Sequence, residues 1–271
     1  MRKKLIIFIW LILYIILLTL IVIYKTHNDT LLVLSNLNSK STIVYDINND
    51  KILYEENIHQ KMLPASLTKV LTALTVYNNI DLNKTVLIDE RILKAVGSRM
   101  YLEVGDVITV KELLYGLILQ SGNDAALALQ YAYSDNPLDF IYKMNEEVSK
   151  LNLKNSLFNN SSGLDEDNFN YTTTYDLAVI TKEAIKYPFL KELFGTKHYQ
   201  VKLDNKTLTF RHKHKLVVTN PNFIGGKTGF TKKAGRTLVS IYKTNNTELI
   251  IVTFNDPNDW KTHTYLGNKF S

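Results

Sequence analysis

Cysteine is absent from the 271 residues of this sequence, and proline is scarce, with only 5 residues. Without cysteine the chain forms no disulfide bridge and no thiolate metal site. With 45% hydrophobic and 21% charged residues, and without internal repeats or low-complexity tracts, its composition is that of a globular protein. Its length suits one large domain or two small ones.

A strong excess of charge of one sign is also missing. The formal net charge is +6, but Arg2, Lys3 and Lys4 stand in the first 24 residues, which hold no acid. The rest of the chain carries 29 Lys and Arg against 26 Asp and Glu, which is too even for a surface that binds nucleic acid. We therefore expect no nucleic acid among its partners.

Histidine gives little support for a metal site. The 6 histidines are scattered, and His212 and His214 in "RHKHK" lie two apart, without acidic ligands nearby. This spacing fits one face of a strand, so we interpret the stretch as a solvated basic strand. We expect no metal and no cofactor.

The N-terminus carries one long apolar run, from Leu5 to Tyr24. As a helix, 20 such residues would span the roughly 30 Å hydrocarbon core of a bilayer. A cleaved signal peptide is the alternative, but its apolar region is usually shorter and ends in small residues, which this run does not. We predict an anchor at 1–24, a linker at 25–40 and a globular domain at 41–271 on the extracytoplasmic side of the cell membrane, because cations precede the run.

Apolar periodicity predicts strands at both ends of the globular domain and helices between them. An initial hairpin is expected from the alternation in 41–47 and 51–57. Helical spacing follows in 66–77, 109–120, 124–133, 137–153 and 172–187. Further strands are predicted at 197–204, 206–213, 224–230, 236–243 and 248–256, before a closing helix at 256–270. The pattern is typical of an α+β fold, an antiparallel sheet with helices packed on it and an inserted helical lobe.

A serine and a lysine three residues apart stand at the start of the first predicted helix. Ser66 and Lys69 share a helical face there, whereas a second such pair, Ser240 and Lys243, lies in a strand pattern that turns the two residues to opposite faces. Serine becomes nucleophilic when a base takes its proton, so Lys69 would have to be neutral near pH 7, about three units below its usual pKa. Apolar neighbours and a second nearby lysine could lower its pKa that far.

Ser121, Gly122 and Asn123 fall in the break between two predicted helices. Polar side chains in such a break can project into a cleft, although a plain helix C-cap and N-cap would use the same residues. The similar triplet from Ser134 to Asn136 precedes Pro137, and we interpret it as a capping turn before the next helix.

A third polar motif, Lys227 and Thr228, lies in a predicted strand after Gly225 and Gly226. Glycines weaken a strand, so their clustering suggests that a substrate backbone approaches closely there. The lysine and threonine would then offer a cation and a hydroxyl to a carboxylate. A glycine-rich strand end with a surface lysine is the alternative.

Taken together and in this order, Ser66-x-x-Lys69, Ser121-Gly122-Asn123 and Lys227-Thr228-Gly229 resemble the three signatures of the penicillin-recognising serine enzymes. The stretches "PASLTKVLTAL", "LLYGLILQSGNDAALAL" and "GGKTGFTKKAGRTLV" are similar to the low-molecular-weight D-alanyl-D-alanine carboxypeptidases, and the likeness runs from about Ser41 to the end. It implies a five-stranded antiparallel sheet and a serine-type carboxypeptidase. Its implied partners are peptidoglycan stem peptides, from which it removes the terminal D-alanine, and β-lactams, which acylate it.

The resemblance also implies roles for the matching residues. Ser66 would form the acyl-enzyme, Lys69 would accept its proton, and Ser121 would relay a proton to the leaving D-alanine. Substrate binding would fall to the residues of the other two motifs and one neighbour: Asn123, Lys227, Thr228, Gly229 and Phe230. The backbone N–H groups of Ser66 and Phe230 would form the oxyanion hole.

The sequence departs from the family pattern in three places. His212 and His214 replace the asparagines of a frequent Asn-x-Asn-x-Leu-Leu stretch. "NDPNDW", after the last long strand, lacks the arginine of many members, which leaves a second carboxylate contact in doubt. A C-terminal β-domain that many members carry is missing as well, so membrane attachment would fall to the N-terminal run.

Three alternatives remain at this point. A D,D-endopeptidase acting on cross-links would use the same fold and chemistry. A β-lactamase is disfavoured because no Glu-x-x-Leu-Asn pentapeptide supplies a glutamate to activate the deacylating water. A β-lactam sensor is disfavoured because only about four residues precede the apolar run, too few for a cytoplasmic effector.

Overall fold

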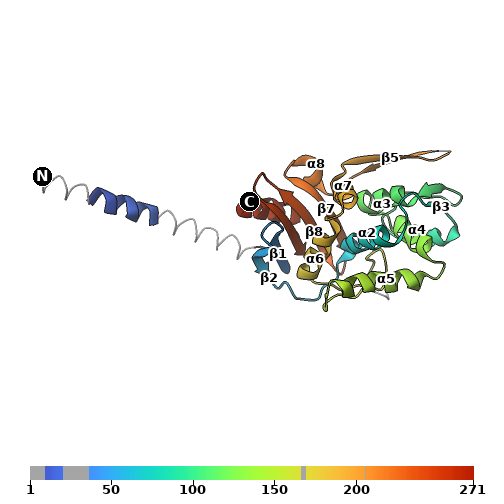
Figure 1. Ribbon diagram of the computed structural model, residues 1–271, viewed down its shortest axis with the longest axis horizontal. Helices are drawn as coiled ribbons and strands as arrows, with labels where there is room; N and C mark the ends of the chain where they lie inside the picture. Colours follow the sequence, from blue (N-terminus) through green and yellow to red (C-terminus); the bar gives the residue numbers. More distant parts are fainter. Residues whose placement is uncertain (1–9, 21–36, 166–168, 205) are drawn as a thin grey trace. The chain divides into compact units, whose positions relative to one another are not determined.

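Figure 1 shows a computed structural model of the chain, which describes residues 10–20, 37–165, 169–204 and 206–271. The chain divides into two compact units, Met1–Asn38 and Ser39–Ser271. In the first unit residues 10–20 are helical, with exposed side chains. No helix within the described residues has the length and apolarity to cross a bilayer, and the remainder of the predicted anchor and linker, at 1–9 and 21–36, lies outside them.

A five-stranded antiparallel sheet forms the base of the second unit, in the order β2-β1-β9-β8-β7. The strands are β1 (Ser41–Asp46), β2 (Lys51–Glu56), β7 (Phe223–Thr231), β8 (Gly235–Lys243) and β9 (Glu248–Phe254). β8 and β9 lie in the middle and are buried on both faces, whereas β2 and β7 are the edges. The predicted α+β class and the antiparallel sheet are confirmed.

Helices cover both faces of the sheet. α9 (Asp259–Phe270) packs on β8 and β9 from one side, and α6 (Thr174–Ala184) packs on β9 and β1 from the other (Figure 1). Beyond α6 lies the predicted helical lobe, whose centre is α2 (Thr68–Asn79). α2 is buried all round from Thr68 to Val76, which is the property of a helix enclosed by other elements.

The lobe also contains α3 (Val110–Leu119), α4 (Asn123–Tyr133) and α5 (Pro137–Lys150). Side chains cap the N-termini of α3 and α5, whereas Gly122 precedes α4 without a side-chain cap. A capping box of Thr109 and Glu112 starts α3. The Asn136 side chain accepts a hydrogen bond from the Leu138 amide at the start of α5, so the "SDN" triplet is the predicted capping turn.

Two separate two-stranded sheets and several short elements lie outside this plan. The predicted strands 197–204 and 206–213 form a separate pair, β5 (His198–Lys202) and β6 (Thr207–Arg211), because Val201 and Phe210 bury against the helical lobe and not on the main sheet. The sequence analysis did not predict the other short elements: β3 (Thr85–Leu87), β4 (Val107–Thr109), α7 (Pro188–Gly195), α8 (Lys215–Thr219) and the 3-10 turn η2 (Glu90–Lys94). The helix predicted from Ser66 begins as the 3-10 turn η1 (Ala65–Leu67) before α2.

The prediction of a solvated basic strand at His212 and His214 is wrong. Both side chains are buried, and His214 caps the N-terminus of α8 by accepting from the Val217 amide. His212 accepts from the His214 amide through Nδ1 and bonds the Phe194 carbonyl through Nε2. These imidazoles can be buried because each ring nitrogen has a polar partner.

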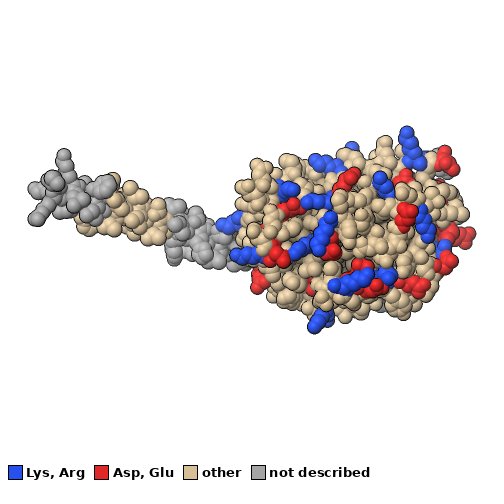
Figure 2. Space-filling model, viewed as in Figure 1, with Lys and Arg blue, Asp and Glu red and all other residues tan. Residues whose placement is uncertain are grey.

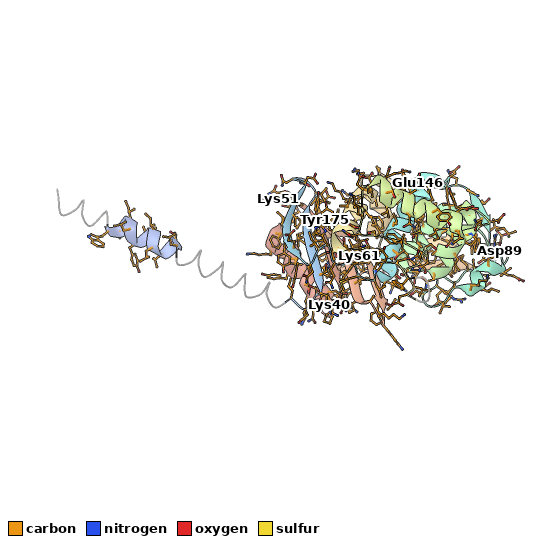
Figure 3. All side chains as sticks on the ribbon, turned by 90° about the horizontal axis from the view of Figure 1, so that it is seen from below. Lys40, Lys51, Lys61, Asp89, Glu146 and Tyr175 are labelled. Atoms are coloured by element: carbon orange, nitrogen blue, oxygen red, sulfur yellow. The ribbon has the colours of Figure 1, made fainter. Side chains whose placement is uncertain are left out.

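Charged side chains of both signs are mixed over the face of the second unit seen in Figure 2, in keeping with the even charge balance of the sequence. In Figure 3, Lys51 of β2 and Asp89, next to η2, lie at opposite ends of this unit. The residues of the three motifs lie between these ends, where β7 meets the helical lobe.

Candidate active site

Ser66 lies in η1, the turn that leads into α2, and β7 passes beside it. Gly229 of β7 makes this approach possible, since a Cβ there would lie 3.1 Å from the Ser66 nitrogen and 2.3 Å from Thr237 Oγ1. Thr237 of β8 donates to the Pro64 carbonyl at 3.0 Å. The turn that carries Ser66 is thereby fixed against the sheet.

Lys69, one turn further along, is fully buried. Its Nζ lies 3.2 Å from Ser66 Oγ, 2.7 Å from Asn123 Oδ1 and 2.6 Å from the Ser162 carbonyl oxygen. Burial lowers the pKa of Lys69 to about 7, with the positive charge of Lys213 as the second cause, although the carboxylate of Asp124 opposes the shift. The neutral amine that a base requires is therefore well populated near pH 7.

The partners of Lys69 Nζ decide how a neutral amine would be oriented. An uncharged amine has two N–H donors and one lone pair. The oxygens of Asn123 and Ser162 can only accept, so they take the two N–H groups. The lone pair is left for the Ser66 hydroxyl, which donates to it, and this is the geometry for general-base removal of the serine proton.

The second lysine of the motifs, Lys227, contacts Ser121. Its Nζ lies 2.9 Å from Ser121 Oγ and 2.8 Å from the Thr228 carbonyl oxygen, and the side chain is buried. Burial and the nearby charges of Lys69 and Lys213 lower the pKa of Lys227 well below its usual value. Ser121 thus joins the strand β7 to the break between α3 and α4, as the sequence placed it.

Backbone strain gathers at this place. Seven non-glycine residues have positive φ among the described residues, and four of them are Asn or Asp, which tolerate it. The other three are Ala65 at +49°, Tyr101 at +71° and Ser121 at +57°. Ala65 and Ser121 flank or form the motifs themselves, so strain coincides with the candidate site, as it often does where side chains are held in reactive positions.

Besides the turn that carries Ser66 and the strand β7, the start of α4 forms the third wall of the site, through Asn123 and its neighbour Asp124. The Asn123 amide nitrogen donates to the Val96 carbonyl, and its oxygen receives the Lys69 amine. Asp124 accepts from the backbone amides of Met100, Tyr101 and Leu102 and so anchors the loop that carries Ser98. The helix N-terminus at Asn123 therefore orients both the base and a loop.

Thr228, Gly229 and Phe230 lie on the edge strand of the sheet. An edge strand leaves every second backbone N–H and C=O without a strand partner, so it can pair with an extended peptide. Phe230 is 65% exposed, and Thr228 is half-buried. The interpretation of Gly225 and Gly226 as substrate contacts is corrected, because a Cβ at these positions would meet Phe194 and His214 of the protein itself.

The motifs meet at a cavity of about 310 Å³. Its lining comes from all three walls: Ser66, Ser98, Ser121, Lys213, Thr228, Gly229, Phe230, Arg236, Asp259 and Trp260. Sequence reasoning missed half of this set, namely Ser98, Lys213, Arg236, Asp259 and Trp260. Lys213 was visible only as one cation of "RHKHK", yet its Nζ lies 3.1 Å from Ser98 Oγ, and partial burial lowers its pKa.

The second Ser-x-x-Lys pair, Ser240 and Lys243, and the triplet from Ser134 to Asn136 lie away from this cavity. Ser240 is buried between His214 and His263 under α9, while Lys243 is exposed at the end of β8 and pairs with Glu248. Ser134 bonds Asp139 at the start of α5. Neither serine has an amine beside it, so neither has the base that Ser66 has.

Comparison with known proteins gives a consistent result. A family model described as D-alanyl-D-alanine carboxypeptidase matches residues 26–258. Among curated proteins, the chain is similar to the D-alanyl-D-alanine carboxypeptidases DacF of Bacillus subtilis, with 33% identity over 80% of this chain and 57% of that protein, and DacB2 of Mycobacterium tuberculosis, with 30% identity over 79% and 73%. The chain thus spans little more than half the length of the first of these relatives.

Solved structures with similar folds include a D-alanyl-D-alanine carboxypeptidase from M. tuberculosis, with a TM-score of 0.80 and 28% identity over 85% of this chain and 89% of that one. The Streptomyces K15 DD-transpeptidase superposes with a TM-score of 0.77 and 28% identity over 82% of this chain and 91% of that one. The five-stranded sheet with its helical lobe is therefore a fold on which serine peptidases of this kind are built.

Proposed function

This chain belongs to the D-alanyl-D-alanine carboxypeptidase family, and we propose that it is a serine-type carboxypeptidase that removes the terminal D-alanine from peptidoglycan pentapeptide stems. The single observation that carries the proposal is the environment of Lys69. Its Nζ lies 3.2 Å from Ser66 Oγ, and its two other partners are the carbonyl oxygens of Asn123 and Ser162. In the neutral amine these two oxygens take the N–H groups, which leaves the lone pair for the Ser66 hydroxyl.

The chemistry follows from this geometry. As Ser66 Oγ attacks the carbonyl carbon of the terminal peptide bond, its proton passes to Lys69 Nζ. The backbone N–H groups of Ser66 and Phe230 would stabilise the developing oxyanion. When the C–N bond breaks, the proton held by Lys69 passes through the Ser121 hydroxyl to the departing D-alanine nitrogen. Water then attacks the ester carbonyl and gives a proton to Lys69, and this proton returns to Ser66 Oγ as the shortened stem leaves.

The substrate would bind as an extended strand along β7. Its backbone would pair with the free edge of the sheet, and its terminal carboxylate would contact Thr228, near the side chain of Lys227. Asn123 would hold a substrate amide or keep Lys69 oriented. These roles apply to the residues in which the three motifs match the family pattern.

The proposal is tested by incubating the purified protein with muropeptides and identifying the products by mass. Release of free D-alanine from pentapeptide stems supports carboxypeptidase action. Release of monomers from cross-linked dimers would identify an endopeptidase instead, and newly formed dimers would identify a transpeptidase. If none of these products forms, the proposed activity is wrong.

β-Lactams would acylate Ser66 and stay bound. Purified protein mixed with benzylpenicillin should gain the mass of the drug on the peptide that contains Ser66, because the sequence lacks the Glu-x-x-Leu-Asn pentapeptide whose glutamate activates the deacylating water of β-lactamases. Rapid turnover of the drug would instead indicate a β-lactamase.

We further propose that residues 1–24 anchor the protein in the cell membrane and that the catalytic domain lies on its extracytoplasmic side. The support is the charge-free apolar run from Leu5 to Tyr24 after three cations. Membrane fractionation of cells that express the full chain, followed by protease treatment of intact spheroplasts, tests both points. Loss of the catalytic domain to the protease is the expected result, and its full protection would contradict the proposed orientation.

A further inference from the structure

The cavity beside Ser66 contains a guanidinium that the mechanism above does not use. Arg236 is the second residue of β8, and it lies directly opposite Phe230 of β7. Thr228 pairs with Leu238, two residues further along β8, so Thr228 and Arg236 are diagonal neighbours on the same face of the sheet. Long side chains reach across such a diagonal. Arg236 therefore stands next to the hydroxyl that would bind a substrate carboxylate.

The guanidinium is held from behind by α9. Its Nε and Nη2 donate to the two carboxylate oxygens of Asp259 at 3.0 and 2.8 Å, and it lies over the Trp260 ring at 5.4 Å from the centroid. The Asp259 side chain is only 3% exposed. A buried carboxylate and an aromatic ring together fix the orientation of the arginine without covering it.

Part of the guanidinium remains available to a ligand. Of its five N–H groups, two are used by Asp259, and none of the other residues that the structure describes accepts a hydrogen bond from the remaining three. The side chain is 40% exposed, and it lines the cavity together with Ser66 and Thr228. A planar fork of N–H donors fits a carboxylate, which can accept two of them at once.

We propose that Arg236 is a specificity-determining residue that binds a carboxylate of the peptide substrate, with Asp259 and Trp260 as the residues that position it. The inference rests on the proposed function and answers the absence of an arginine in "NDPNDW". In this stretch the chain has an acid, Asp259, which accepts two hydrogen bonds from Arg236 of β8. The carboxylate is either that of the terminal D-alanine or that on the side chain of the third stem residue.

The test uses three pentapeptides and the full-length protein. One peptide has all its carboxylates free, the second has its C-terminal carboxylate as a methyl ester, and the third has the side-chain carboxylate of its third residue as an amide. For each protein variant, the ratio of kcat/KM between the free acid and each blocked peptide measures how strongly that carboxylate is recognised.

Arg236→Gln should lower kcat/KM for the free acid about 10- to 100-fold, the usual effect of losing a charge-assisted hydrogen bond. It should also abolish the preference for one carboxylate. Loss of the preference over the ester assigns Arg236 to the terminal carboxylate, and loss of the preference over the amide assigns it to the third residue. Lys261→Gln, which removes an exposed cation from α9, should leave both preferences as they are.

Arg236→Gln leaves the buried Asp259 without its partner and can impair folding, so thermal melting is measured in parallel. The double variant Arg236→Gln/Asp259→Asn contains no orphaned charge and should show the same loss of preference. Asp259→Asn alone keeps the guanidinium but frees it to move. It should raise KM for the free acid with little change in kcat, and Asp259→Glu should restore KM.

Both preferences surviving in Arg236→Gln and in the double variant would overturn the inference. That outcome differs from a failure of the proposed function, in which the unaltered protein would release no D-alanine from any of the three peptides.

Discussion

Two clusters of buried titratable side chains lie on opposite sides of β7 and β8. They differ in whether a hydrogen-bonding group remains available to a substrate. In the first, Lys69 Nζ lies 3.2 Å from Ser66 Oγ, and Ser66 lines a cavity that a substrate can enter. In the second, His214 bonds Ser240, Ser240 bonds His263, and His263 bonds Thr253. This second chain is closed, since it ends on protein atoms that are all buried.

Burial depresses the pKa in both clusters. The pKa of Lys69 falls to about 7 and that of His263 to about 3, with desolvation as the main cause in each. A perturbed pKa therefore does not by itself mark a catalytic group. The useful distinction is whether a donor or a lone pair remains directed at a space that a substrate can enter. The lysine cluster has this property and the histidine cluster does not.

Removing the serine from each cluster should give the largest difference between them and tests whether only the first is catalytic. Ser66→Ala should reduce kcat and penicillin acylation by at least about 1,000-fold, since among the described residues Ser66 supplies the only hydroxyl that contacts Lys69 Nζ. Ser240→Ala should leave the activity of the folded protein within a few-fold of normal. It should instead lower the free energy of unfolding by about 1–3 kcal/mol, because two histidine nitrogens lose their partner.

These two variants are compared by stopped-flow acylation and urea unfolding. A Ser240→Ala protein that melts normally but no longer reacts with penicillin would give the histidine cluster a catalytic role and end the distinction.

A second pair of serines tests the contact of Ser121 with Lys227. Ser121→Ala removes the hydroxyl that lies 2.9 Å from Lys227 Nζ and should slow acylation about 100-fold, the size expected for a lost proton relay. Ser134→Ala alters only the turn before α5 and should cost about 1 kcal/mol of stability or less, with normal acylation. Equal acylation rates for the two variants would contradict the assignment.

The histidine cluster should reveal itself in the dependence of stability on pH. The pKa of His263 is lowered to about 3, and that of His214 is also lowered. Next to this cluster, His212 accepts from the His214 amide and has a pKa lowered to about 4, so all three histidines take up protons more readily in the unfolded chain. Their contribution is present above a pH of about 6.5 and is lost as the pH falls below it, by at most about 1.4 kcal/mol per pH unit for each histidine.

Urea unfolding between pH 6.5 and 5 measures this slope. His263→Asn should reduce the slope by up to about 1.4 kcal/mol per pH unit, the contribution of one histidine. An unfolding free energy that stays constant over this range would show that the histidines are not held neutral.

The smallest expected effect concerns the charge that adjusts Lys69. Lys213→Met removes the cation that helps to lower the pKa of Lys69, so this pKa should rise and the acid limb of acylation should move to higher pH. Burial is the larger cause, so the shift should stay below about one unit, with a few-fold loss of rate at pH 7. Lys215→Met, at an exposed lysine two residues on, should leave the profile unchanged. A profile that moves to lower pH would contradict this role.

The candidate catalytic residues lie together in the structure as the sequence suggested, because their arrangement depends largely on local spacing. Ser66 and Lys69 are one helical turn apart, and the break between α3 and α4 at Ser121 to Asn123 follows from the pattern of apolar residues. The predicted second lysine near Lys69 is also present, but the cation that most lowers its pKa is Lys213. Sequence spacing could not show which lysine, Lys227 or Lys213, lowers the pKa of Lys69 more. The answer depends on how β7 and the segment before α8 lie around the site.

The residues that sequence missed are placed by long-range packing. Arg236 reaches the cavity because of the register between β7 and β8, and Asp259 meets it because α9 packs on that face. His214 is buried because Ser240, 26 residues away, supplies a partner for its Nε2. Hydrogen bonds of this kind follow from the completed sheet, so periodicity along the chain gives no sign of them.

The methyl group of Ala65 lowers the stability of the protein but helps to hold the residue that follows it, Ser66, in position. An L-alanine at φ +49° costs roughly 1 kcal/mol that glycine would not, so a glycine here should yield a hardier protein. The same freedom would loosen the peptide unit that precedes the attacking oxygen. Ala65→Gly should therefore raise the free energy of unfolding and slow the acylation of Ser66.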